Sequence, residues 1–303
     1  MTPEDMLARL LYRDGLMLVI DKPAGFAVHR GPKGGASLED YFEPLRFGLP
    51  RNPALAHRLD KDTSGCLVLG RHRKALALLG KLFKQGKVGK TYWAVVEGGP
   101  DADAGRIDLP LGKLDESRGW WMKPDPHGAP AVTTWRVMGR SHFVEGAASP
   151  QRSLPPCGGG TGRGVDASAD LAATPHPNRP PQGGREPTAA GGAAKSFRQL
   201  TWLALEPLTG RTHQLRVHCA EMGWPILGDN IYGRAPRTGG PILHLHSREI
   251  VVPIAKNKPP VTITAPVPAH MREALGQCGW RGEADTPPVR SRGSGNPESS
   301  LQA

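Results

Sequence analysis

The sequence is consistent with an α+β fold, because segments with the character of strands outnumber those with the spacing of helices. β-Branched and aromatic residues gather in several short runs, while few segments have the caps or the periodicity of a helix. The 303-residue chain also contains 39 glycines and 31 prolines, so part of it is expected to be unstructured. These patterns alone do not select how the strands are arranged in a sheet.

The predicted strands are short and are separated by turns. The run KTYWAVV at 90–96 is typical of a strand, since it is rich in β-branched and aromatic residues. An apolar run at 66–69 is typical of a buried strand, and Pro23 and Gly25 form a turn after the first strand. In order, the predicted strands are 16–20, 26–28, 66–69, 90–96, 107–111, 132–138, 197–205, 242–246 and 261–265.

Helices are predicted at three places. Over 73–85 the leucines recur on one face while most lysines fall elsewhere, which is the pattern of an amphipathic helix. Ser37 is the predicted cap of a short helix that Pro44 interrupts. Thr209 is the predicted cap of a helix that ends at Gly223.

Two segments are too polar to be expected to fold. Between Phe143 and Phe197 there is no aromatic residue and no isoleucine, and glycine and proline are frequent. We interpret the insertion at about 145–195 as a disordered loop that joins two strands of one hairpin; a linker between separate domains is the alternative. Residues 281–303 are predicted to be a disordered tail, which leaves one domain at 1–280.

The chain is strongly basic, with a formal net charge of +11 and an isoelectric point of about 9.8. A balance of this size favours polyanionic partners, nucleic acid first and a membrane surface second. One stretch holds many basic residues and no acid before Glu97, which suits contact with phosphates. Its basic residues are Arg71, Arg73, Lys74, Lys81, Lys84, Lys87 and Lys90.

The cysteines and the N-terminus indicate a reducing compartment. The 4 cysteines lie far apart and form no C-x-x-C pair, which argues against a zinc ribbon or a redox pair. The acidic start lacks the basic and apolar regions of a signal peptide, and no apolar run has the length of a membrane span. We therefore expect a cytoplasmic monomer that does not cross a membrane.

The densest charged motif is HRLDKDTSG at 57–65. Asp60 lies there among basic residues that include Arg58, and a second motif at 209–220 supplies Arg216. A guanidinium beside a carboxylate keeps the carboxylate ionised, as a nucleophile at neutral pH requires. The same pattern also describes a structural Arg–Asp pair, which is the interpretation that the chemistry alone favours.

The histidines raise the possibility of a metal site, with His57 and Asp60 or His213 and His218 as ligands. His213 and His218 are five residues apart, so on a helix they point in different directions. The arginines around them also create a positive field that disfavours a cation. We therefore expect no metal ligands in this chain.

Taken together, the motifs resemble those of the RluA family of RNA pseudouridine synthases. The resemblance covers most of 10–268, apart from the insertion, and the motifs follow one another in the order of the family. They are DKPAG at 21–25, HRLDKDTSG at 57–65, KTY at 90–92, GRTHQLRVH at 210–218 and ILGDNIYG at 226–233.

The resemblance implies an α+β catalytic domain on a mixed, mostly antiparallel sheet with flanking helices and an active cleft across its middle. The implied reaction breaks the bond from uracil N1 to ribose C1′ and rejoins the base through C5, with no metal or organic cofactor. Asp60 matches the catalytic carboxylate and Tyr92 the tyrosine that faces the target base. Arg216 matches the arginine that pairs with the catalytic carboxylate, and Arg58 matches a residue that holds the place or phosphate of the flipped-out nucleotide. Asp62 and His57 are then left with a role in shaping the loop.

The resemblance implies ribosomal RNA, transfer RNA or both as substrate. Since the first predicted strand begins near Leu16, there is no room for the separate N-terminal RNA-binding domain that some relatives carry. One alternative is a non-catalytic RNA-binding or RNA-folding protein on the same scaffold, although binding alone does not require the set of Asp60, Tyr92 and Arg216. Another is a metal-dependent nuclease or hydrolase. Whether Asp60 attacks C1′ or the base stays open.

Overall fold

The computed structural model describes residues 1–31, 34–115, 120–141, 199–255 and 257–283. The predicted insertion at about 145–195 lies outside the described residues, as does nearly all of the predicted tail. Within the described part of the chain, no helix is long and apolar enough to cross a membrane.

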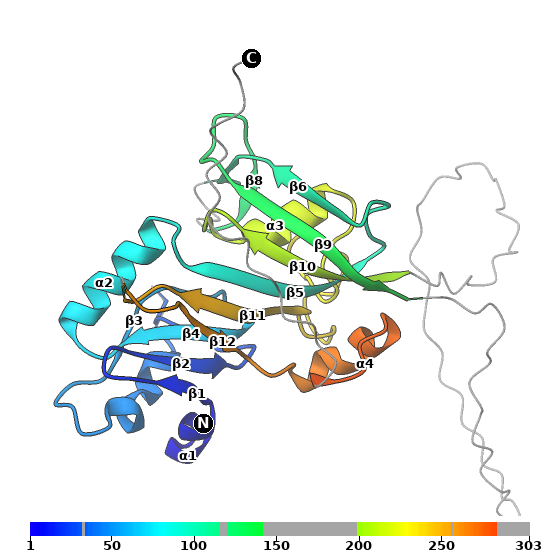
Figure 1. Cartoon of the computed structure of the whole chain (residues 1–303). Helices are drawn as coiled ribbons and strands as arrows, with labels where there is room; N and C mark the ends of the chain where they lie inside the picture. The colour runs from blue at the N-terminus through cyan, green and yellow to red at the C-terminus, as the bar shows by residue number, and fades with distance from the viewer. Residues whose placement is uncertain (32–33, 116–119, 142–198, 256, 284–303) are drawn as a thin grey trace, which may run out of the picture. The chain divides into compact units, whose positions relative to one another are not determined.

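The described residues are built around one mixed sheet, whose strands follow the order β1-β2-β4-β11-β5-β10-β9-β6, with β12 beside β11 and β3 beside β4 (Figure 1). Every strand pair is antiparallel except β4 and β11, which are parallel. The strands of this sheet are β1 (Leu10–Arg13), β2 (Met17–Lys22), β3 (Ala54–Leu55), β4 (Ser64–Gly70), β5 (Gly89–Glu97), β6 (Ala104–Asp108), β9 (Val132–Arg140), β10 (Leu200–Pro207), β11 (Leu245–Val252) and β12 (Val261–Thr264).

The helices and a small second sheet complete the described structure. β7 (Leu111–Lys113) and β8 (Met122–Pro124) pair antiparallel as a two-stranded sheet. Two short 3₁₀ helices follow one another, η1 (Leu38–Tyr41) and η2 (Glu43–Arg46). The α-helices are α1 (Pro3–Ala8), α2 (Arg73–Lys84), α3 (Gln214–Glu221) and α4 (Ala269–Gln277). The predicted α+β class with a mixed, mostly antiparallel sheet and flanking helices is confirmed.

The apolar core lies on both faces of the sheet, because successive side chains of a strand point to opposite faces. On β2, for example, Leu18 and Ile20 pack with α1, α3 and the 3₁₀ helices, whereas Met17 and Val19 pack with α2. The central strand β5 divides in the same way, and α4 covers Trp93 on the second face. Strands buried on both faces read as continuous apolar runs, which is why the sequence marks β4 and β5 so clearly.

Several predicted elements are confirmed with small shifts in their ends. The predicted helix over 73–85 is α2, and the predicted hairpin is the antiparallel pair β9 and β10. The short helix capped by Ser37 is η1, where Ser37 and Asp40 form a reciprocal capping box. η2 has a proline in its first turn and follows directly.

Other predictions were wrong, for local physical reasons. Residues 26–28 form no strand, because the Ala27 carbonyl accepts from the N–H of Leu38 while Val28 packs into the core. Thr209 does not cap a helix: its hydroxyl accepts from the N–H of Val132 and donates to the side chain of Gln214, and α3 begins only at Gln214.

The positions of two strands and of the C-terminal end of the domain also differ from the prediction. The first strand is β1, which begins at Leu10 rather than near Leu16. The strand predicted at 242–246 is β11, which runs from Leu245 to Val252 and carries polar residues that are buried. At the other end, Glu283 lies beyond the predicted domain boundary at 280 and belongs to the folded part, since its carboxylate accepts from Arg248 and from the N–H of Val267.

Candidate active site

The loop that carries Asp60 connects β3 to β4 and is fixed by hydrogen bonds from Lys22. The Lys22 side chain is fully buried, and its Nζ donates to the carbonyls of Pro23 (2.8 Å), Lys61 (2.9 Å) and Thr63 (2.8 Å). Three acceptors match the three donors of an ammonium group. The DKPAG motif therefore has a structural purpose, since its lysine ties the end of β2 to the loop.

The charge of Lys22 is balanced between two effects. Burial lowers the pKa of Lys22 to about 7, while the nearby carboxylates of Asp62, Asp60 and Asp21 favour the charged form. Gly25 adds a backbone bond to the same loop, because its N–H donates to the Lys61 carbonyl at 2.9 Å. The loop thus has fixed carbonyls at Lys61 and Thr63, directly after Asp60 and on either side of Asp62.

Two further residues fix the ends of the loop. Gly65 has a φ of +103°, and a Cβ there would collide with the backbone of Ser247 on β11, so only glycine fits. His57 accepts from the N–H of Val68 at Nε2 (3.0 Å) and stacks on Phe83, and burial lowers its pKa to about 3. The prediction that His57 shapes the loop is consistent with these contacts.

Asp60 is placed differently from the sequence prediction. Its side chain is 20% exposed, and the Nε2 of His213 lies 3.9 Å from the Asp60 Oδ2. The predicted pairing of Arg216 with Asp60 is wrong as a direct contact. Arg216 instead donates through Nε (2.8 Å) and Nη2 (2.7 Å) to both carboxylate oxygens of Asp229.

The Arg216–Asp229 pair is part of the framework of the site. Both side chains are almost completely buried, and Asp229 also accepts from the N–H groups of Ile231 and Tyr232. Although burial opposes ionisation, the hydrogen bonds and charge of Arg216 hold the pKa of Asp229 below its usual value. Asp60 is still within electrostatic reach of Arg216, where its charge favours the guanidinium.

Tyr92 lies on β5 close to Asp60. Its side chain is 9% exposed, packs in the core and hydrogen-bonds Ser247. Burial raises the pKa of the Tyr92 phenol, and the charge of Asp60 raises it further, so the phenol keeps its proton at neutral pH. The structure therefore brings two of the predicted residues together, an aromatic side chain and an acid.

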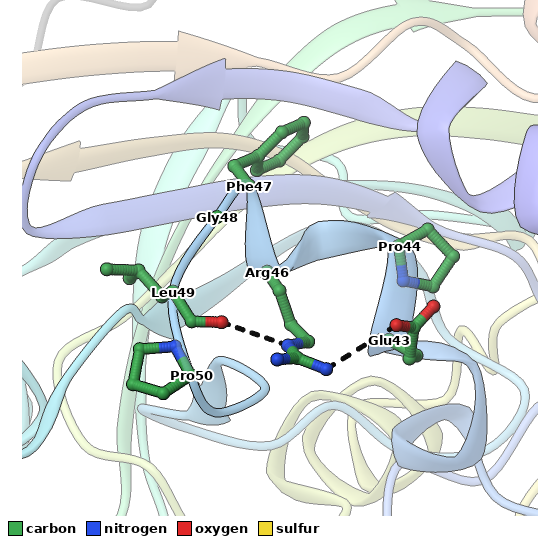
Figure 2. A pocket seen from close by; sticks show the side chains of 7 residues that line it. All are labelled: Glu43, Pro44, Arg46, Phe47, Gly48, Leu49 and Pro50. Atoms are coloured by element: carbon green, nitrogen blue, oxygen red, sulfur yellow. Dashed lines mark hydrogen bonds and ion pairs between the residues drawn. The ribbon is translucent and has the colours of Figure 1, made fainter.

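The remaining predicted residue, Arg58, is exposed on the Asp60 loop, where a ligand can reach it. Asp62 lines a small cavity of about 180 Å³ together with Arg216 and Asn230. A larger, open hollow of about 590 Å³ is formed by 43–50, where Arg46 bonds the Leu49 carbonyl and pairs with Glu43 (Figure 2). It contains none of the predicted site residues, so we do not assign it to the chemistry.

Three aromatic or imidazole groups extend the site beyond the predicted set. His213 Nδ1 and the Tyr232 hydroxyl are 2.8 Å apart, and the exposed indole of Trp120 meets the His213 ring edge to face at 5.2 Å. The sequence signalled His213 only as a possible metal ligand. Tyr232 lies in the ILGDNIYG motif, which gave it no role of its own, and the only local signal at Trp120 was its pairing with Trp121 before a polar turn. Among the described residues, no group of three or more His, Cys, Asp or Glu is arranged to hold a metal ion.

Comparison with known proteins decides the family. Residues 16–221 match the family described as RNA pseudouridylate synthase. The chain belongs to this family. The resemblance to the RluA-type enzymes is therefore confirmed, and so is the prediction of an RNA pseudouridine synthase, which is an isomerase.

Individual relatives and structures agree with this membership. An uncharacterised RNA pseudouridine synthase of Zymomonas mobilis is 36% identical over 264 residues, which cover 86% of this chain and 94% of that protein. The ribosomal large subunit pseudouridine synthase C of Vibrio cholerae is 29% identical over 277 residues, covering 88% and 68% of the two chains. The fold is similar to human RNA pseudouridylate synthase domain containing 4, with a TM-score of 0.61, 22% identity and coverage of 91% and 95%.

Proposed function

We propose that this pseudouridine synthase isomerises specific uridines in ribosomal RNA, transfer RNA or both, with Asp60 as its catalytic carboxylate. The observation that carries the proposal is the setting of Asp60. Its side chain is partly exposed, on a loop whose carbonyls accept hydrogen bonds from Lys22. Tyr92 lies close enough for its pKa to respond to the charge of Asp60. A catalytic group on a rigid scaffold needs little reordering when the substrate arrives.

The reaction moves one bond and one proton. The bond between uracil N1 and ribose C1′ breaks, the base turns, C5 bonds to C1′, and the proton on C5 leaves while N1 gains one. Asp60 is the carboxylate that assists the departure of the base from C1′. Tyr92 lies against the base, and its protonated phenol is a hydrogen-bond donor that becomes a base only as it gives that proton up.

RNA recognition is expected to use the exposed arginine of the loop and the basic stretch that begins at Arg71. A base can reach Asp60 only after it leaves the stack, so the enzyme must hold the backbone on each side of it. Arg58 is exposed on the Asp60 loop, which supports a role in holding the place or phosphate of the target nucleotide. The lysines of α2 and those just beyond it add positive charge along the protein surface.

The names of two relatives support the proposed substrate classes. One is named a ribosomal large subunit pseudouridine synthase and another, from Salmonella typhimurium, a tRNA pseudouridine synthase that is 28% identical over 284 residues. Both RNA classes are therefore candidates for this chain. We place the protein in the cytoplasm, as a monomer with one catalytic domain at about 1–280.

The proposal is tested by mapping pseudouridine in cells that lack the gene. Sites lost on deletion are expected to return with the wild-type chain and to stay absent with Asp60→Asn, although that variant should still bind RNA. If Asp60→Asn restores every lost site, Asp60 is not the catalyst. If deletion removes no site from ribosomal or transfer RNA, the substrate assignment is wrong.

The second candidate is a protein that binds or folds RNA on the same scaffold without catalysis. An ionisable carboxylate beside a protonated tyrosine has no purpose in binding a polyanion, because it repels phosphate. The same mapping separates the two, since a non-catalytic protein leaves the pseudouridine pattern unchanged when its gene is removed.

A further inference from the structure

His213 has a backbone conformation that calls for an explanation. Its φ is +52°, in the left-handed region, and within the described residues Phe47 is the other non-glycine residue with positive φ. Such a conformation costs on the order of 1–3 kcal/mol and persists where surrounding contacts enforce it. His213 occupies the N-cap position of α3, yet its side chain makes no capping hydrogen bond. The His213 imidazole therefore interacts with groups other than the N–H donors at the start of α3.

The hydrogen bonds of Tyr232 determine which nitrogen of His213 carries the proton. The Tyr232 oxygen accepts from the N–H of Met122 at 2.9 Å, and it lies 2.8 Å from His213 Nδ1. If Nδ1 donated to Tyr232, the phenol oxygen would accept twice and its own proton would have no partner among the described residues. The consistent assignment is that Tyr232 donates to Nδ1. The proton of the neutral ring is then on Nε2.

Nε2 is the nitrogen that faces the proposed catalytic carboxylate. It lies 3.9 Å from the Asp60 Oδ2, longer than a hydrogen bond, as is common in an active site without its substrate. The ring is 7% exposed and the edge of Trp120 covers part of it. Burial lowers the pKa of His213 and outweighs the opposing effect of Asp60, so the ring is neutral at pH 7.

We infer that Tyr232 and His213 form a relay that positions Asp60, in which Tyr232 fixes the His213 tautomer and the Nε2–H is donated to the Asp60 carboxylate when RNA binds. The inference rests on the proposed function of Asp60. It also gives His213 the orienting role that the sequence had assigned to Arg216. A neutral donor fixes the direction of the carboxylate while leaving it more of its basicity than a guanidinium would.

The tautomer can be observed directly. Long-range ¹H–¹⁵N correlation spectra of protein labelled at histidine distinguish an imidazole protonated at Nε2 from one protonated at Nδ1. The His213 signals are identified by their absence from His213→Asn. We expect the Nε2–H form in the wild type and a gain of the Nδ1–H form in Tyr232→Phe. A wild-type ring protonated at Nδ1, or at both nitrogens at pH 7, overturns the inference.

The kinetic test compares two substitutions of His213 whose side-chain amide nitrogens lie at different distances from the backbone. A Gln amide nitrogen extends about as far as Nε2, whereas an Asn amide nitrogen corresponds to Nδ1. We expect His213→Asn to lower kcat about 10²-fold with little change in KM, and His213→Gln to recover most of that loss. Equal losses in the two variants, or no loss in His213→Asn, overturn the inference. Melting temperatures show whether each variant is folded.

Two controls distinguish a failure of this inference from a failure of the proposed function. Tyr12→Phe also removes a phenol that is hydrogen-bonded, to Asp14, and should leave kcat and the His213 spectrum unchanged. If Asp60→Asn is inactive while His213→Asn is fully active, the relay is wrong and the role of Asp60 stands. If Asp60→Asn is active, the proposed function fails, whereas the tautomer measured in the spectrum is unaffected.

Discussion

The two carboxylates of the site, Asp60 and Asp229, are held in opposite ways. Asp229 is 1% exposed, and two nitrogens of Arg216 and two backbone N–H groups bind it. Asp60 is 20% exposed and faces a single imidazole at 3.9 Å. A buried carboxylate that already accepts four hydrogen bonds is out of reach of a substrate, while a partly exposed carboxylate with one neighbour at 3.9 Å is within reach. The difference separates the framework of the site from its chemistry.

The largest difference between the two should appear in catalysis. We expect Asp60→Asn to lower the rate of pseudouridine formation by about 10³-fold or more, because the amide is not ionised. Its unfolding midpoint in urea should stay close to that of the wild type. The rate is measured on total ribosomal and transfer RNA from cells that lack the gene. A large fall in the urea midpoint would make Asp60 part of the framework instead.

Asp229→Asn should show the reverse pattern, with the largest effect on folding. The substitution leaves the Arg216 charge buried without its anion, and breaking such a pair costs about 3–5 kcal/mol of unfolding free energy. Urea titration measures the loss directly. Replacement of the exposed carboxylate Asp108 on β6, which pairs with Arg106, is a matched control expected to cost well under 1 kcal/mol. Similar costs for both would remove the distinction drawn here.

The exposed indole of Trp120 is a third group of the site. It tests whether the exposed part of the site also includes a side chain that binds RNA. Trp120 is 54% exposed and touches His213, so it is placed to stack with an unpaired base next to the target. We expect Trp120→Ala to weaken RNA binding by roughly 5- to 150-fold, the equivalent of about 1–3 kcal/mol.

Trp120→Phe, which keeps a ring, should lose less binding than Trp120→Ala. Leu7→Ala on α1 also removes an exposed apolar side chain and should leave RNA affinity unchanged. Equal binding by the wild type and Trp120→Ala, measured by fluorescence anisotropy of labelled RNA, would contradict the stacking role.

The smallest effect is the pH dependence of the Asp229 contribution. Its pKa is below the usual value in the folded protein, so at acid pH the unfolded chain binds more protons. The unfolding free energy therefore falls as pH falls from about 4 through the folded-state pKa. The difference in stability between wild type and Asp229→Asn should narrow over that range. Urea titrations from pH 6 downward would contradict this if the difference stays constant.

Much of the fold was predictable because its strands are buried on both faces. β4 and β5 read as apolar runs, and α2 has the spacing of an amphipathic helix. β11 was placed too early, because Ser247, Arg248 and Glu249 look like surface residues and are buried instead. Arg248 is accommodated by Glu283, a residue that follows it at a long separation in sequence. Such a pairing cannot be inferred from local patterns.

The site was predictable where a motif specified one residue and not where two residues compete for one partner. Asp60 and Tyr92 lie near each other as the family motifs imply. The sequence predicted that Arg216 pairs with Asp60, whereas in the structure it pairs with Asp229. Both carboxylates were available, and only packing decides between them. Lys22 was interpreted as part of a turn, since nothing local shows that three carbonyls from two segments converge on its ammonium.

The position of β11 has a consequence for the synthesis of the protein. This strand lies between β4 and β5, and its Ser247 contacts both Gly65 of the Asp60 loop and Tyr92. It comes after residue 221, where the family match ends, and Arg248 within it is paired with Glu283. While the chain is still being translated, the two halves of the site have no strand between them. The Asp60 loop and Tyr92 can therefore take up their final arrangement only after β11 has been synthesised.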